Sequence, residues 1–88
     1  MPIDAKEAEV AFRELIAAME RGREGAIQRS PVLRRDFDSA IGAAQKAVEQ
    51  LRLGKFDVAR NLWTKNAPLR VIARQYDAES ERISAVFE

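Results

Sequence analysis

The sequence predicts an all-α protein, a small antiparallel bundle of three longer helices and one short helix in a single domain over residues 1–88. Helix-favouring residue types dominate the chain, and only four glycines and three prolines interrupt it. Apolar residues recur at alternating steps of four and three, which is typical of amphipathic helices. A chain of this length buries only about 60% of the surface that its unfolded form exposes, so its core is thin.

The first helix is expected to begin at Asp4, whose carboxylate can cap the free amides of the opening turn. Its small and apolar stripe is Ala8, Phe12, Leu15, Met19, Gly22 and Ala26. Gly22 and Gly25 each lower helix stability by about 1 kcal/mol. The helix therefore either ends near Arg21 or continues to Arg29 with a bend or fraying at the glycines, and we favour continuation.

The second helix is expected to start at Ser30 and Pro31, with serine as the N-cap and proline at the first helical position. Its stripe is Leu33, Phe37, Ala40, Ala44, Ala47 and Leu51. Gly54 follows this stripe and is well placed as a left-handed C-terminal cap.

A short third helix is expected from Phe56 to Lys65, and Pro68 disfavours helical geometry at the residue before it. The last helix should start at Pro68, with the stripe Leu69, Ile72, Tyr76, Ser80, Ile83 and Phe87. Because this register holds across Asp77, one helix to the end of the chain is favoured over a break at Asp77–Ala78.

Residues 68–87 also admit a helix-turn-helix with its turn at Asp77–Ala78. That turn lacks the glycine often found in this motif. Its second helix would begin with Glu79 and Glu81, which repel phosphate groups. This reading is therefore disfavoured.

Gly54, Phe56 and Ala59, followed by Trp63 and Ala67, form a pattern that resembles the middle of a tetratricopeptide repeat. In that family a helix ends at glycine, an aromatic residue follows and an alanine comes next. The resemblance covers residues 54–67 and implies peptide binding. The preceding helix lacks the family's aromatic-and-glycine pattern, and no second copy occurs, so a generic helical hairpin explains the same residues and is favoured.

The sequence contains no cysteine and no histidine, which excludes thiol nucleophiles, imidazole bases and histidine-ligated metals. Asp36 and Asp38 come closest to a paired-carboxylate site, but residues two apart on a helix point in different directions. The sequence therefore predicts no catalytic residue, no cofactor and no metal site, and the protein is not expected to be an enzyme.

The charged residues near the N-terminus, among them Asp4, Lys6 and Glu7, argue against a signal peptide. The longest uncharged stretch, residues 39–45, is far shorter than the roughly 18 residues that a membrane span needs. Small secreted domains usually carry disulfides. We therefore expect a cytoplasmic protein with no membrane partner.

The leading functional hypothesis is a non-catalytic protein-interaction or assembly module: an adaptor, a small chaperone, an inhibitor of the antitoxin type, or a homo-oligomeric structural subunit. A thin core and heptad-like stripes favour it, because helices pair between chains through such stripes. The expected partner is a second copy of the chain or another protein. Aromatic residues often anchor such interfaces, and the candidates are Phe37, Phe56, Trp63, Tyr76 and Phe87.

The alternative is a small nucleic-acid-binding protein that uses the basic stretch 31–76. This stretch carries nine basic and four acidic residues, whereas residues 77–88 carry one basic and four acidic residues. Binding to phosphates would weaken steeply with added salt, unlike binding through an apolar interface. The candidate contacts are Arg34, Arg35, Arg52, Lys55, Arg60, Arg70 and Arg74.

Overall fold

The computed structural model describes residues 5–27 and 31–87, without the side chains of residues 26, 27 and 31–33. The capping roles expected for Asp4 and Ser30 lie outside the described residues. Within these ranges the helices are joined by short turns and there is no strand, which confirms the predicted all-α class. The helices are α1 (Ala5–Ile27), α2 (Pro31–Arg52), α3 (Phe56–Lys65), α4 (Ala67–Ala73) and α5 (Asp77–Phe87).

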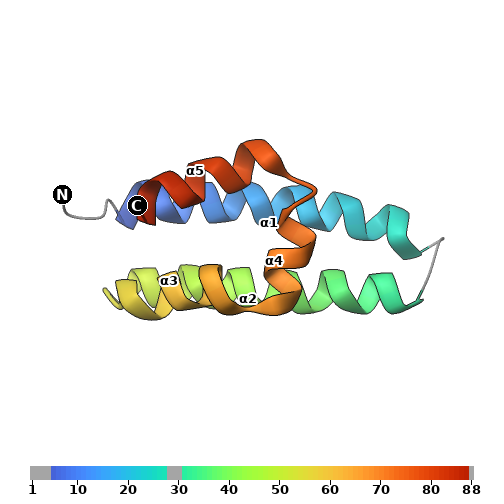
Figure 1. The fold of residues 1–88 in the computed structure, drawn as a ribbon, viewed down its shortest axis with the longest axis horizontal. Helices are drawn as coiled ribbons and strands as arrows, with labels where there is room; N and C mark the ends of the chain where they lie inside the picture. The colour runs from blue at the N-terminus through green and yellow to red at the C-terminus, as the bar shows by residue number, and fades with distance from the viewer. Residues whose placement is uncertain (1–4, 28–30, 88) are drawn as a thin grey trace.

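Figure 1 shows the helices in two layers. α1 packs along α2, α3 lies beside α2, and α5 lies beside α1, while α4 packs on α2 and leads the chain from one layer to the other. Ion pairs join α1 and α2 towards both ends: Arg52 Nε lies 2.7 Å from Glu9 Oε1, and Arg23 Nη1 lies 2.9 Å from Asp38 Oδ1. The start of each long helix is therefore beside the end of the other.

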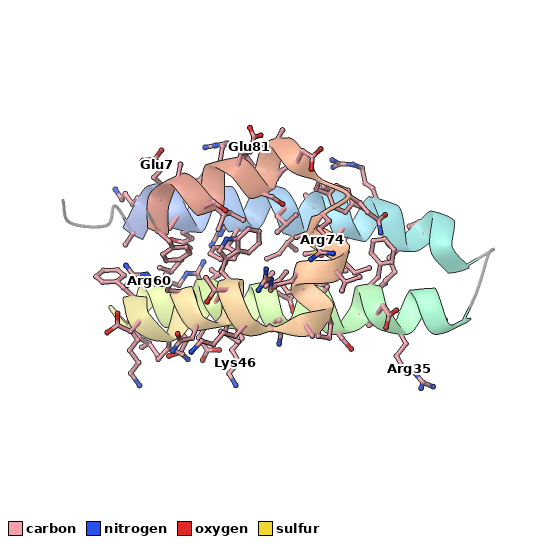
Figure 2. All side chains as sticks on the ribbon, in the orientation of Figure 1. Glu7, Arg35, Lys46, Arg60, Arg74 and Glu81 are labelled. Carbon is pink, nitrogen blue, oxygen red and sulfur yellow. The ribbon has the colours of Figure 1, made fainter. Side chains whose placement is uncertain are left out.

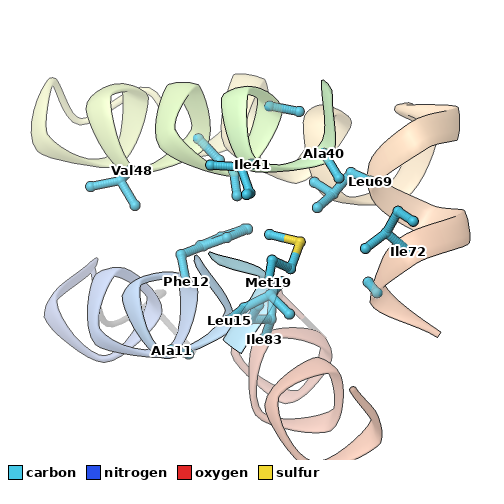
Figure 3. Packing of buried hydrophobic residues seen from close by; sticks show 14 of the residues in the cluster. Ala11, Phe12, Leu15, Met19, Ala40, Ile41, Val48, Leu69, Ile72 and Ile83 are labelled. Carbon is cyan, nitrogen blue, oxygen red and sulfur yellow. The ribbon is translucent and has the colours of Figure 1, made fainter. Parts of the chain in front are cut away.

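The core is built largely from alanine, which lets the two long helices approach closely. Figure 3 shows Phe12, Leu15 and Met19 of α1 facing Ile41 and Val48 of α2. Among the described residues, no polar or charged residue is buried. The buried alanines are Ala8, Ala11 and Ala18 in α1, Ala40, Ala43, Ala44 and Ala47 in α2, Ala59 in α3 and Ala73 in α4.

The predicted turn after α2 is confirmed. Gly54 adopts φ +76°, a left-handed conformation that a side chain would strain. The amide of Lys55 donates to Gln50 O at 2.9 Å, and the amide of Gly54 donates to Leu51 O at 3.1 Å. This is the Schellman pattern of hydrogen bonds, which satisfies the last carbonyl groups of a helix and reverses the chain into the next one.

α1 continues through Gly22 and Gly25 to Ile27, as favoured from the sequence. Gly22 is required for close packing. A Cβ atom built there would overlap the Tyr76 hydroxyl group and lie 2.9 Å from Cε1 of Phe37. A residue without a side chain thus lets the turn after α4 and the first half of α2 dock on α1.

The prediction of one helix from Pro68 to the end is wrong, and the described residues form five helices in place of the expected four. α4 ends at Ala73 and α5 begins at Asp77. The amide of Tyr76 donates to Ala73 O at 2.9 Å, and Ser80 Oγ donates to the same carbonyl at 2.7 Å. These two bonds satisfy the carbonyl group of Ala73, which would otherwise lose its hydrogen-bond partner where the helix ends.

The physical reason for the break is that the two halves of this segment bury their apolar residues in different layers. Leu69 and Ile72 are buried on α4, which packs on α2. Ile83 is buried on α5, which packs on α1, and Figure 3 shows it beside Leu15. α4 begins at Ala67, one residue before the predicted start at Pro68. It begins there because the Asn66 side chain caps the helix by accepting a hydrogen bond from the Leu69 amide at 3.0 Å.

Replacing Gly22 by alanine is expected to destabilise the protein. The added Cβ would crowd Tyr76 and the ring of Phe37, which is only 3% exposed and has little room to move. Overpacking of this kind costs about 1–3 kcal/mol, which exceeds the gain of about 1 kcal/mol from helix propensity. Urea denaturation followed by circular dichroism should therefore give a lower free energy of unfolding for Gly22→Ala.

Gly42→Ala is the matched control. Gly42 is exposed within α2, and a Cβ there meets nothing within 4 Å. This substitution should raise the free energy of unfolding by about 0.5–1 kcal/mol, because alanine favours the helix. Equal stabilisation by both substitutions would contradict the close packing at Gly22.

Candidate binding groove

A groove of about 470 Å³ lies between α3, α4 and α5. Its volume falls within the range of about 300–1,000 Å³ that is typical of ligand pockets. We call it the arginine groove and define it by its lining residues. They are Arg60, Trp63, Thr64, Arg70, Ala73, Arg74, Asp77, Ser80, Ser84 and Phe87.

Two aromatic residues of the groove are held in place by Phe12, which is fully buried on α1. The rings of Phe12 and Trp63 meet edge to face, with centroids 5.9 Å apart and an interplanar angle of 87°. The rings of Phe12 and Phe87 lie 6.1 Å apart at 59°. Trp63 Nε1 donates to Ser84 Oγ at 3.2 Å and so links α3 to α5. These contacts fix the aromatic side chains before any ligand binds.

Three arginines line the same groove: Arg60 from α3, Arg70 from α4 and Arg74 from the turn after α4. Arg70 Nη1 donates to Thr64 O at 2.7 Å, which orients its guanidinium group. Arg60 Nη1 lies 3.7 Å from Asp57 Oδ1, and its Nε is buried without a hydrogen-bond partner among the described residues. The exposed Arg74 side chain has no hydrogen bond or ion pair within the described chain. Figure 2 shows Arg60 and Arg74 in the space between the two layers.

The remaining polar groups of the groove are hydroxyl groups and one carboxylate. Ser80 and Ser84 are one turn apart on α5, and Thr64 Oγ1 donates to Arg60 O at 2.9 Å. Asp77 is the single acidic residue among the lining residues. The groove thus combines three permanent cations, a lone carboxylate, hydroxyl groups and aromatic surface.

The predicted basic residues separate into groups in the structure. Arg60, Arg70 and Arg74 come together in the groove, whereas Arg52 pairs with Glu9. Of the others, Arg34 and Arg35 are exposed near the start of α2, and Lys55 is exposed in the turn before α3. Figure 2 shows Arg35 pointing away from the body of the molecule, at the opposite end from Arg60.

The predicted interface aromatics all contact the protein's own core. Phe37 is buried, while Phe56, Trp63, Tyr76 and Phe87 are half-buried and pack against the buried cluster. Trp63 and Phe87 also line the groove.

Sequence reasoning missed the groove's polar groups Thr64, Asp77, Ser80 and Ser84. The available signal was the place of Ser80 within the apolar stripe of the last helix, where a hydroxyl group needs a partner. That partner is Ala73 O at the end of α4.

Tyr76 lies in the turn between α4 and α5, beside Gly22. Burial raises the pKa of its hydroxyl group above the usual value, the positive charge of Arg21 lowers this pKa, and the negative charge of Glu79 raises it. Burial is the largest of these effects, so the phenol keeps its proton to a higher pH than an exposed tyrosine does.

In the described ranges, no group of three or more aspartates and glutamates is arranged to hold a metal ion. Within the same ranges, no helix has the length and apolar character required to cross a membrane. Comparison with known protein families, with curated proteins and with solved structures gives no match.

The titration of Tyr76 should have a midpoint above the ordinary tyrosine value of about 10. Tyr76 is the only tyrosine in the sequence, so the absorbance of tyrosinate follows it directly. Because its pKa is raised on folding, its contribution to stability is fully present below the unfolded pKa and is lost as the pH rises through the folded pKa.

Two charge-removing substitutions test the causes of this shift. Arg21→Gln should raise the titration midpoint further, whereas Glu79→Gln should lower it. A midpoint at or below the ordinary value, or the opposite response to the two substitutions, would show that the environment of Tyr76 has been misassigned.

Proposed function

We propose that this protein is a cytoplasmic, non-catalytic interaction module, built as an antiparallel helical bundle, that binds another protein through the arginine groove. The observation that carries this proposal is the convergence of Arg60, Arg70 and Arg74 on one groove that also contains Trp63 and Phe87. Arginine and large aromatic residues are the side chains most enriched at the energetic centres of protein interfaces.

The chemistry of the groove supports binding over catalysis. Arginine stays protonated and only donates hydrogen bonds, so it does not act as a general base. Acid–base catalysis is most efficient when the group that takes the proton has a pKa near the working pH. The chain contains no histidine, and Asp77 is the only carboxylate in the groove.

The distribution of charge favours a protein over a nucleic acid. α5 borders the groove and begins with Asp77 and Glu79 in its first turn, and its last turn carries no basic residue. A nucleic acid presents a continuous row of phosphates, which these carboxylates would repel. Figure 2 shows Arg35 at the opposite end of the molecule from Arg60, and Arg34 precedes it near the start of α2, so neither residue extends the cationic surface of the groove.

A different partner is favoured over a second copy of the chain. Among the side chains that the structure describes, the large apolar ones that remain exposed are Val10, Leu53, Val58 and Val71, and they are spread over α1, the turn before α3, α3 and α4. We therefore expect a monomer by light scattering after size exclusion, at both low and high salt. A dimer that persists at high salt would support the homo-oligomeric version instead.

Affinity capture with matched variants tests the proposal. The bait is the full chain, the extract comes from the source cells after nuclease treatment, and the retained proteins are quantified by mass spectrometry. The double substitution Arg60→Glu/Arg74→Glu reverses the charge of two groove residues. The control Arg34→Glu/Arg35→Glu makes the same change in net charge near the start of α2, outside the groove. We expect at least one protein to be retained by the wild type and the control, and to fall by about tenfold or more with the groove variant.

The same protein set on all three baits would contradict a protein-binding groove. So would groove-dependent retention that occurs only in a parallel capture from extract without nuclease treatment. Thermal denaturation of each bait establishes that it is folded before capture. Arg74 is exposed and its side chain has no partner among the described residues, so replacing it should leave the fold intact.

A further inference from the structure

The arginine groove is cationic along one side only. Arg60 and Arg70 come from α3 and α4, and Arg74 follows directly on α4. The opposite wall is α5, which contributes Asp77, Ser80 and Ser84 and no cation. A ligand that matches this groove must therefore be negative where it meets α3 and α4, and neutral or positive where it meets Asp77.

The arginines retain unused hydrogen-bonding capacity. Arg60 is weakly engaged: its neighbour Asp57 is 94% exposed and 3.7 Å from its Nη1, so that pair contributes little and the Nη atoms can turn to a ligand. Within the described residues, the Nε atoms of Arg60 and Arg23 are both buried without a partner, but Asp38 engages Arg23 Nη1 at 2.9 Å. Arg70 is oriented by a backbone carbonyl group and keeps other donors for a ligand. Guanidinium groups bind carboxylates through paired hydrogen bonds, which gives both strength and direction.

The apolar part of the groove is fixed in place. Trp63 is held by Phe12 on one side and by Ser84 through its indole N–H, and Phe87 also packs on Phe12. Ala73 completes this surface without adding bulk. A ligand side chain that docks there meets aromatic surface whose freedom is already restricted, which reduces the entropy lost on binding.

We propose that the partner's docking segment is an acidic peptide. Its aspartate or glutamate side chains pair with Arg60, Arg70 and Arg74, and an adjacent aliphatic or aromatic side chain packs on Trp63 and Phe87. The end of the segment that lies beside Asp77 carries no acidic residue. This inference rests on the proposed function and adds the chemistry of the partner to it.

The experiment is a selection from a random peptide library displayed on phage, with the wild-type protein as target and Arg60→Glu/Arg74→Glu for counter-selection. The consensus peptide is then synthesised and titrated into the wild-type protein. Trp63 is the only tryptophan in the sequence, so its fluorescence reports binding at the groove itself. A short single-stranded DNA and a duplex of the same net charge serve as competing probes.

We expect a consensus that combines acidic residues with an aliphatic or aromatic residue. The groove variant should weaken its binding by about tenfold or more, and Arg34→Glu/Arg35→Glu by less than about twofold. Asp77→Asn should allow acidic residues at the end of the peptide that lies beside position 77, because it removes the carboxylate that repels them there. Adding salt should weaken binding without abolishing it, since the apolar contact remains.

A consensus without acidic residues, the absence of any selected binder, or tighter binding of either DNA probe would overturn the inference. So would equal weakening by the groove variant and the control variant. Affinity capture separates this failure from that of the proposed function. A groove-dependent protein partner with no acidic consensus overturns the peptide chemistry alone, whereas an acidic consensus with no captured protein overturns the proposed function alone.

Discussion

The contacts of Phe12 join α1 to two of the short helices, α3 and α5. Its fully buried ring meets Trp63 of α3 at 5.9 Å and Phe87 of α5 at 6.1 Å, so one side chain of α1 joins both layers. Aromatic pairs of this kind contribute about 0.5–1.5 kcal/mol each beyond the area that they bury. The hydrogen bond from Trp63 to Ser84 closes the triangle between α1, α3 and α5. The same rings form part of the groove, so the packing that stabilises the fold also shapes the site.

Small residues set the spacing around this centre. The alanines between α1 and α2 bring the two helices close together, and Gly22 does the same for Phe37 and Tyr76. Close packing compensates in part for a chain that is too short to build a thick core. The groove lies at the edge of this packing, lined by residues of α3, α4 and α5 and of the turn between α4 and α5.

The sequence was sufficient for features that depend on local chemistry. Gly54 and Pro31 predict helix ends because of their backbone preferences, and the stripe of α2 predicts its buried face. The break after Ala73 was missed because Ile83 fits the apolar register of a continuous helix as well as that of a separate one. Ile83 packs in the layer of α1, which is far away in the sequence. The periodicity of a segment does not show which distant helix it packs against.

The candidate site was also predictable only in part, because it depends on contacts between residues far apart in the sequence. The sequence gives Arg60, Arg70 and Arg74 as candidate contacts for an anionic partner, but it does not distinguish them from Arg52, which pairs with Glu9 across the two long helices. Whether an arginine is paired depends on a side chain from another helix, here Glu9 of α1, which the sequence does not place beside it. Aromatic residues at helical spacing predict either a core or an interface, and Trp63 serves the core with one part of its surface while another part lines the groove.

The break after Ala73 is also what creates the groove. In a continuous helix, Arg70, Arg74 and Asp77 would follow one another at steps of four and three along a single face, with no wall opposite them. The break turns α5 into the other layer, so that Ser80 and Ser84 line the same space as Arg60 of α3. Ser80 Oγ also donates to Ala73 O at 2.7 Å and thereby stabilises the turn. The hydroxyl group that satisfies the end of α4 is thus a lining group of the groove, and the fold and the site depend on the same hydrogen bond.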